Sequence, residues 1–257
     1  MVHGVGFRDA RYFNYWGRIP KELRRRGATI YYGNQEGWAT IEYNASLLKS
    51  RVEEILKETG AEKLNIIAHS KGGLDCRCMI STYNMGEYIA SLTTMGTPHF
   101  GVKFADVLLK IIPNSIVTGV SNIINKLFSS YGDTNPDFKA AVNQLTEAYA
   151  VKFNKENPDA KSVYYQSYSS VMRCALSDYI LSVPYIIGKL VGSKRNDGLV
   201  PEPSAHWGEF RKEFSNKRHI HGVSHGDIID LKRDDYNGFD IISEYVKIVE
   251  DLKNKGY

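Results

Sequence analysis

The stretch KLNIIAHSKGGLDCRC, residues 63–78, decides how the rest of this chain is interpreted. It begins with a short apolar run from Leu64 to Ala68, passes a serine in a glycine-rich corner, and continues as a helical pattern from Leu74. An apolar run that is bounded by glycines and followed by a helix predicts a buried parallel strand feeding a crossover helix. Ser70 stands where that strand becomes the helix.

Ser70 has two interpretations at this point. Ala68 lies two residues before it, Gly72 lies two residues after it, and Gly73 follows. A serine on a sharp strand-to-helix turn needs such small neighbours because the two backbones approach closely, which is the logic of the G-x-S-x-G nucleophile elbow. Here alanine takes the place of the first glycine. The alternative is an ordinary strand–turn–helix whose serine caps the helix, and the pentapeptide alone does not decide between them.

Length and composition favour one soluble α/β domain spanning residues 1–257. The chain has 257 residues, of which 42% are hydrophobic and 24% charged, values that are ordinary for a globular protein with a substantial core. No apolar stretch approaches the roughly 18 residues that a membrane helix needs, so no transmembrane segment is expected.

The charge pattern argues against a nucleic-acid partner. The net charge is +4, with 33 basic and 29 acidic residues, and the short basic cluster Arg24–Arg26 lies within a helical pattern. A solvated helix face accounts for this cluster.

The three cysteines do not define a disulfide framework or a zinc site. Cys76 and Cys78 are two apart on a predicted helix, so their side chains point in different directions and cannot bridge each other. At most one disulfide to Cys174 is possible, and reduced, buried thiols are favoured. C-x-C without a second pair is poor zinc spacing.

Strand and helix patterns alternate through the first hundred residues, which predicts an α/β fold with a mostly parallel sheet covered by helices on both faces. Active sites in such sheets lie beyond the carboxyl ends of the strands, where Val5, Ser70 and His99 fall. Strands are expected at 28–32, 64–68, 92–95 and 162–168, and a weak last strand within 210–222. Helices are expected at 20–26, 45–59, 74–83, 102–112, 116–128, from 135 to about 153, and at 239–252. The segment 179–191 is expected to be a loop or a helical hairpin, because Pro184 and Gly188 interrupt its apolar run.

If Ser70 is a nucleophile, it needs a base and an acid that orients the base. The second half of the chain has four histidines, His206, His219, His221 and His225. His225 is the best base because it lies in a loop after the last strand and before the last helix, whereas His219 and His221 alternate as strand residues do and His206 suits the surface. Asp197 is the best acid because it lies in a turn between the late strand and His225, although Asn-Asp-Gly is also a common plain turn.

The oxyanion of such a reaction needs two donors. The backbone N–H of Lys71 directly follows the serine, and that of Val5 lies in the early His3-Gly4-Val5-Gly6 loop. The order serine, acid, histidine is the one found in α/β-hydrolases.

Several blocks of this sequence resemble the bacterial true lipases, the secreted triacylglycerol lipases typified by Pseudomonas, Burkholderia and thermophilic Bacillus. They occur in the family's order over essentially the whole chain: His3–Gly6, Ala68–Gly73, Gly96-Thr97-Pro98-His99-Phe100-Gly101, Asn196–Val200 and His225-Gly226-Asp227. The resemblance implies an α/β-hydrolase fold with Ser70 as nucleophile, Asp197 as acid, His225 as base, and Val5 and Lys71 as oxyanion donors. Hydrolysis of fatty-acyl esters is the activity it implies.

The resemblance also bears on metals and location. The thermophilic Bacillus lipases have a zinc-binding insertion before the elbow, but residues 34–61 are too few for it and contain no histidine or cysteine, so no zinc is expected. Many members hold a structural calcium ion beside the histidine loop, and Asp227 matches a family ligand two residues after the histidine. Asp234 and Asp235 follow on the same loop, and Asp178 lies near the place where a second segment contributes, so these four residues are the expected calcium ligands; a solvated acidic loop is the alternative. The family is secreted, but this sequence shows no signal peptide, so the compartment stays open.

The segment of about 102–158 is expected to be a helical lid. Ile116, Val120, Ile123, Ile124 and Leu127 form one apolar stripe in it. Such a stripe usually packs in a core, but related lipases carry a mobile lid at this place in the chain. A short-chain esterase, an acyltransferase or a peptidase on the same fold, and a non-catalytic binding protein, remain alternative functions.

Overall fold

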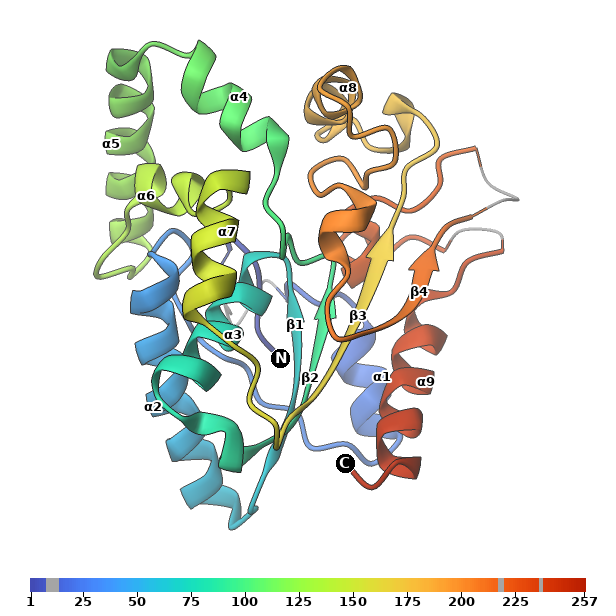
Figure 1. Ribbon diagram of the computed structural model, residues 1–257. Helices are drawn as coiled ribbons and strands as arrows, with labels where there is room; N and C mark the ends of the chain where they lie inside the picture. The colour runs from blue at the N-terminus through green and yellow to red at the C-terminus, as the bar shows by residue number, and fades with distance from the viewer. Residues whose placement is uncertain (8–13, 217–219, 236–237) are drawn as a thin grey trace.

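The computed structural model describes residues 1–7, 14–216, 220–235 and 238–257, and in this part of the chain a four-stranded sheet lies between layers of helices (Figure 1). The strands follow one another in chain order across the sheet, and every neighbouring pair is parallel. They are β1 (Leu64–His69), β2 (Ile89–Met95), β3 (Tyr164–Ser170) and β4 (Glu209–Phe214). The parallel sheet predicted from the alternating pattern is confirmed.

Helices flank the sheet and extend beyond the carboxyl ends of its strands (Figure 1). They are α1 (Ile19–Arg25), α2 (Ile41–Thr59), α3 (Lys71–Thr82), α4 (Lys103–Ile111), α5 (Asn114–Ser130), α6 (Phe138–Asn143), α7 (Glu147–Glu156), α8 (Ser182–Leu190) and α9 (Ile241–Asn254). The three cysteines, which lie in α3 and just after β3, are all free.

The two faces of β1 show how the sheet divides the core. Ile66 and Ala68 pack in a cluster with α2 and α3, whereas Ile67 between them packs in a second cluster with α1 and α9. Successive residues of a strand point to opposite faces, so Ile66, Ile67 and Ala68 are all apolar because both faces of β1 are covered there.

The N-terminus lies along the outer edge of β1. Val2 forms a parallel bridge with Ala68, and the Met1 backbone exchanges hydrogen bonds with Tyr31 and Gly33 at 2.7 and 2.9 Å. The prediction of a strand at 28–32 was wrong, because this segment runs beside Met1 but forms no ladder of hydrogen bonds that would define a strand. A β-rich composition does not make a strand where so few backbone groups find a partner.

Capping explains where the helices depart from the expected boundaries. α2 begins four residues early because the Thr40 hydroxyl accepts a hydrogen bond from the Tyr43 N–H. The single helix expected after residue 135 is two helices, α6 and α7, because Thr146 caps the second in the same way. The segment at 179–191 contains a regular helix, α8, since Pro184 stands in its first turn, where no N–H is needed.

The segment after β2, in which a helical lid was expected at about 102–158, contains the helices α4 to α7. The apolar stripe of α5 faces solvent: Ile123 is 70% exposed, whereas Val117 and Ser121 on the opposite face are buried. No single helix in the described residues is long and apolar enough to cross a membrane. Taken as a pair, α4 and α5 are long and apolar enough to pass the test for a membrane span, but they are bent by 114° relative to each other.

Candidate active site

Ser70 occupies a strained turn between β1 and α3. Its φ and ψ are 54° and −135°, a left-handed backbone that a non-glycine residue adopts only where the surroundings enforce it. A Cβ atom on Gly72 would lie 2.2 Å from the His3 carbonyl oxygen, and one on Gly4 would lie 2.7 Å from the Ser70 Cβ. The close approach that the small residues predicted is therefore present, and it includes the early His3–Gly6 loop as well as the elbow.

Asp197 and His225 form a buried pair. The His225 Nδ1 lies 2.7 Å from the Asp197 Oδ2, and the His225 backbone N–H donates to the Asp197 carbonyl at 2.8 Å. Asp197 Oδ1 accepts hydrogen bonds from the N–H groups of Leu199 and Val200 at 3.0 and 2.7 Å. With one carboxylate oxygen held by the Asn-Asp-Gly turn, the other is aimed at the imidazole, where it favours the tautomer with its proton on Nδ1 and a lone pair on Nε2.

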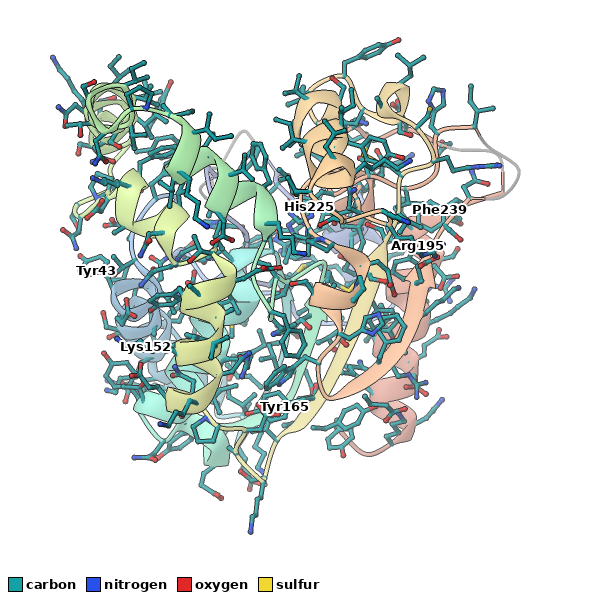
Figure 2. The ribbon with its side chains drawn as sticks, turned by 45° about the horizontal axis from the view of Figure 1, so that its top comes forward. Tyr43, Lys152, Tyr165, Arg195, His225 and Phe239 are labelled. Carbon is teal, nitrogen blue, oxygen red and sulfur yellow. The ribbon has the colours of Figure 1, made fainter. Side chains whose placement is uncertain are left out.

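The Asp197–His225 pair lies next to the serine turn, at the carboxyl ends of β1 and β2. The ring of His69, the residue before Ser70, lies 4.3 Å from the His225 ring between centroids. A Cβ on Gly96, which follows β2, would lie 3.3 Å from both Asp197 Oδ2 and His225 Nδ1. Figure 2 shows His225 at this end of the sheet, near α8.

His69 is a neighbour of the site that the sequence did not single out. The hydroxyl of Tyr15 accepts from the Gly4 N–H at 3.1 Å and is hydrogen-bonded to His69 Nδ1 at 2.5 Å. Burial, with the nearby charge of His225, holds the pKa of His69 well below its usual value. His69 therefore stays neutral and packs on His225 without competing for its proton.

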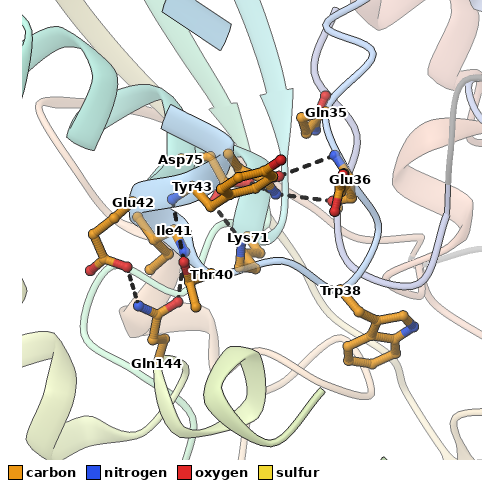
Figure 3. Close-up of polar contacts among 12 residues, drawn as sticks. Gln35, Glu36, Trp38, Thr40, Ile41, Glu42, Tyr43, Lys71, Asp75 and Gln144 are labelled. Atoms are coloured by element: carbon orange, nitrogen blue, oxygen red, sulfur yellow. Dashed lines mark hydrogen bonds and ion pairs between the residues drawn. The ribbon is translucent and has the colours of Figure 1, made fainter. Parts of the chain in front are cut away.

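Lys71 contributes a buried side chain as well as a backbone N–H next to Ser70. Its ammonium group pairs with Asp75 at 2.6 Å, and Asp75 also accepts from Asn44 at 3.0 Å (Figure 3). Both charged side chains are buried, at 1% and 2% exposure. This pair fixes the first turn of α3 against α2, and so the backbone of Lys71 beside the serine. Val5, the other expected donor, follows Gly4 in the loop that contacts Ser70.

The contacts of His206 and His99 are with residues other than Asp197. His206 pairs with Glu202 at 2.5 Å and stacks on Phe210. His99 is buried against Trp207, with its Nε2 3.1 Å from the Thr94 hydroxyl, so it stabilises the core below the site. His221 is half-buried, and His219 lies outside the described residues.

The four expected calcium ligands fall into two groups. Asp178 and Asp227 meet at the ammonium group of Lys232, at 2.7 and 3.2 Å. Asp235 instead pairs with Arg18 at 2.8 Å, and the same guanidinium contacts the backbone carbonyl of Asp234 at 3.4 Å. The described residues contain no cluster of three or more His, Cys, Asp or Glu side chains placed to hold a metal ion. Lys232 was not singled out from the sequence, because its separation from Asp178 and Asp227 along the chain follows no recognised motif.

Comparison with known proteins places this geometry in a family. The sequence profile of the palmitoyl protein thioesterase family matches residues 3–236. The chain is 31% identical to triacylglycerol lipase 2 of Saccharomyces cerevisiae over 97% of this chain and 78% of that protein.

Solved structures give the same fold. The crystal structure of Staphylococcus hyicus lipase matches 98% of this chain and 94% of its own with a TM-score of 0.75 at 17% identity. The mature Bacillus licheniformis lipase BlEst2 matches 90% of this chain and 85% of its own with a TM-score of 0.67 at 20% identity. The α/β-hydrolase fold expected from the sequence is confirmed.

Proposed function

This chain belongs to the family of α/β-hydrolases that the palmitoyl protein thioesterase profile describes and that includes triacylglycerol lipases, and we propose that it hydrolyses fatty-acyl esters through an acyl-enzyme on Ser70. The observation that carries the mechanism is the buried Asp197–His225 pair, whose imidazole packs on His69, the residue directly before the strained Ser70. Each element of this arrangement comes from a different loop, as in other serine hydrolases.

The proposed reaction has two steps. His225 Nε2 takes the proton of the Ser70 hydroxyl as its oxygen attacks the ester carbonyl, and the protonated imidazole then donates to the leaving alcohol. Water, activated by the same nitrogen, releases the fatty acid and restores Ser70. The Asp197 carboxylate stabilises the imidazolium in both steps and does not itself accept the proton.

The backbone N–H groups of Val5 and Lys71 are the proposed oxyanion donors. Lys71 is the first residue of α3, where backbone N–H groups have no helical partner, and the helix dipole favours negative charge there. The contact of Gly4 with Ser70 supports the placement of Val5 beside the same oxygen. A donor of this kind is worth about 3 kcal/mol in the activation barrier.

The exposed apolar helices support a long acyl substrate that is met at a lipid–water interface. Ile116, Ile123 and Leu127 of α5 are 54%, 70% and 47% exposed, and Ile180 and Leu190 at the two ends of the α8 region are 87% and 81% exposed. Both groups lie beyond the carboxyl ends of the strands (Figure 1). Apolar side chains that are held in water around a site gain free energy when they contact lipid, so the proposal assigns the α4–α5 segment the role of a lid.

Replacement of Ser70 with alanine tests the mechanism. Ser70→Ala should lower kcat on a medium-chain p-nitrophenyl ester by at least about 10⁴-fold while leaving the melting temperature unchanged, because only the nucleophile is removed. A fluorophosphonate should label the unaltered protein and not the variant. Labelling of neither protein, or full turnover by the variant, would favour a non-catalytic binding protein or another nucleophile.

The match to the thioesterase family profile makes acyl thioesters a second candidate substrate. An oxyanion and an acyl-enzyme arise from a thioester and an oxygen ester alike, since only the leaving group differs. Rates measured on palmitoyl esters and palmitoyl thioesters of matched length, together with amides and acceptor alcohols, will separate lipase, thioesterase, peptidase and acyltransferase activity.

A further inference from the structure

The loop that contains His225 is held by two carboxylates that share one lysine. Asp227 Oδ2 accepts from the Ser224 N–H at 2.9 Å, and Asp178 Oδ2 accepts from the Ser224 hydroxyl at 2.9 Å. Lys232 lies 2.7 Å from Asp178 and 3.2 Å from Asp227. We call these four residues the lysine clamp. It fixes the residue directly before His225 and, through Asp227, the turn directly after it.

All four carboxylate oxygens of the clamp have polar partners. Asp178 Oδ1 accepts from the backbone N–H groups of Ile180 and Leu181 at 3.1 and 3.3 Å, which ties the clamp to the start of the α8 region. Asp178 Oδ2 and Asp227 Oδ1 both face the ammonium group. Since Asp178 and Asp227 are 5% and 4% exposed, their two negative charges need a cation at close range.

The space around the clamp does not suit a hydrated or fully ligated divalent ion. A cavity lined by residues that include Arg18, Asp227, Lys232 and Asp235 has a volume of about 10 Å³, at most the room for one water molecule. Calcium takes six to eight oxygens at about 2.3–2.6 Å. Asp235, which would have to supply one of them, is paired with Arg18. The expected calcium set therefore does not fit the side chains as they are arranged.

We propose that the ammonium group of Lys232 takes the place of a divalent cation at the histidine loop, so that this protein positions His225 without calcium. Lys232 is a positioning residue in this scheme. It acts on His225 through Asp178, Asp227 and the two donors of Ser224, and it also joins the histidine loop to the segment that leads into α8.

Substitution of Lys232, with and without calcium, tests the proposal on the full chain. The unaltered protein should keep its melting temperature and activity in EDTA and gain nothing from millimolar calcium. Lys232→Ala should lower the melting temperature by about 5 °C, because two nearly buried carboxylates lose their cation, and should lower kcat about tenfold with little change in KM. In Lys232→Ala, millimolar calcium should restore part of the melting temperature and part of kcat. Magnesium should restore less of each, because magnesium needs a stricter octahedral geometry than calcium does.

Two further variants and one control complete the test. Lys232→Arg should retain most of the melting temperature and activity, and Asp227→Asn combined with Lys232→Ala should abolish the response to calcium. Lys247→Ala is the control, because it removes the same charge from an ion pair with Glu244 on the exposed side of α9, and it should behave as the unaltered protein does.

Three results would overturn the proposal. The first is a fall in the melting temperature of the unaltered protein in EDTA that calcium reverses. The second is a Lys232→Ala variant with the same melting temperature and kcat as Lys247→Ala. The third is a Lys232→Ala variant whose melting temperature and kcat do not rise when calcium is added. The kcat measurement rests on the proposed role of His225. The melting temperatures do not, so a failure of the ester-hydrolase mechanism would leave the test of the clamp intact.

Discussion

The two oxygens of the Asp197 carboxylate have separate partners, and this division is what makes the residue more than a turn former. Oδ1 is held by two backbone N–H groups of the Asn196–Val200 turn, and Oδ2 by His225 Nδ1. The turn interpretation of Asn-Asp-Gly is confirmed, and the turn also orients the carboxylate toward the imidazole, which is the orientation that the proposed catalytic role requires.

Replacement of Asp197 with asparagine should separate these two functions. In Asp197→Asn the amide oxygen can still accept from Leu199 and Val200, while its NH₂ group faces Nδ1 and forces the proton onto Nε2, the wrong nitrogen for a base. We expect kcat to fall by about 10⁴-fold with the melting temperature nearly unchanged, as measured by ester hydrolysis and thermal unfolding. The control is Asp137→Asn, which changes only the N-cap of α6, a position that asparagine fills equally well. A decrease in kcat of less than tenfold in Asp197→Asn would contradict the assignment of Asp197 as the acid.

At the scale of the element, α5 carries its apolar side chains on two faces with different environments. Val117 is 6% exposed, and Ile123 is 70% exposed. The C-terminal end of the helix is attached firmly, because the Glu36 carboxylate accepts from the N–H groups of Thr134 and Asn135 at 2.6 and 2.9 Å. Gln144 continues this attachment by accepting from the Ile41 N–H at 2.7 Å (Figure 3). A lid motion would therefore pivot near residues 132–137.

Matched serine substitutions on the two faces should have opposite effects. Val117→Ser should cost about 2 kcal/mol of stability, because it leaves a small cavity and buries a hydroxyl. Ile123→Ser should change stability by less than about 0.5 kcal/mol but lower the rate on emulsified long-chain esters several-fold, leaving a soluble short-chain ester unaffected. Chemical unfolding and the two rate assays measure these effects; if Ile123→Ser destabilises the protein as Val117→Ser does, the stripe is core and not a lipid-facing surface.

At the scale of the whole molecule, local patterns predicted the sheet, but long-range partners determined the details. The apolar run at 64–68 and its glycine corner predicted β1, the turn and α3, because burial on both faces and the need for small residues at the turn are both visible in the local sequence. The prediction of a strand at 28–32 was wrong because a strand needs a hydrogen-bonded ladder with a neighbour, which the local sequence does not specify. The apolar stripe of α5 was identified, but periodicity defines only a face of the helix and does not say whether that face contacts the core or solvent. Lys232 was missed because its partners Asp178 and Asp227 come together only in the folded chain.

The arrangement of exposed apolar helices around one buried acid–base pair predicts how the activity should depend on the physical state of the substrate. Ile180 and Leu190 near α8, and Ile123 on α5, remain in water in the isolated protein, and transfer of such side chains to lipid is worth about 25 cal/mol per Å² of apolar surface. We therefore expect the hydrolysis rate to rise with acyl-chain length and to increase sharply when the ester passes its solubility limit. Initial rates over a series of acyl lengths, each measured below and above that limit with Ser70→Ala as the blank, provide the measurement. A rate that falls steeply beyond short acyl chains and shows no increase at the limit would make the protein a short-chain esterase, since the apolar helices would then contribute nothing to turnover.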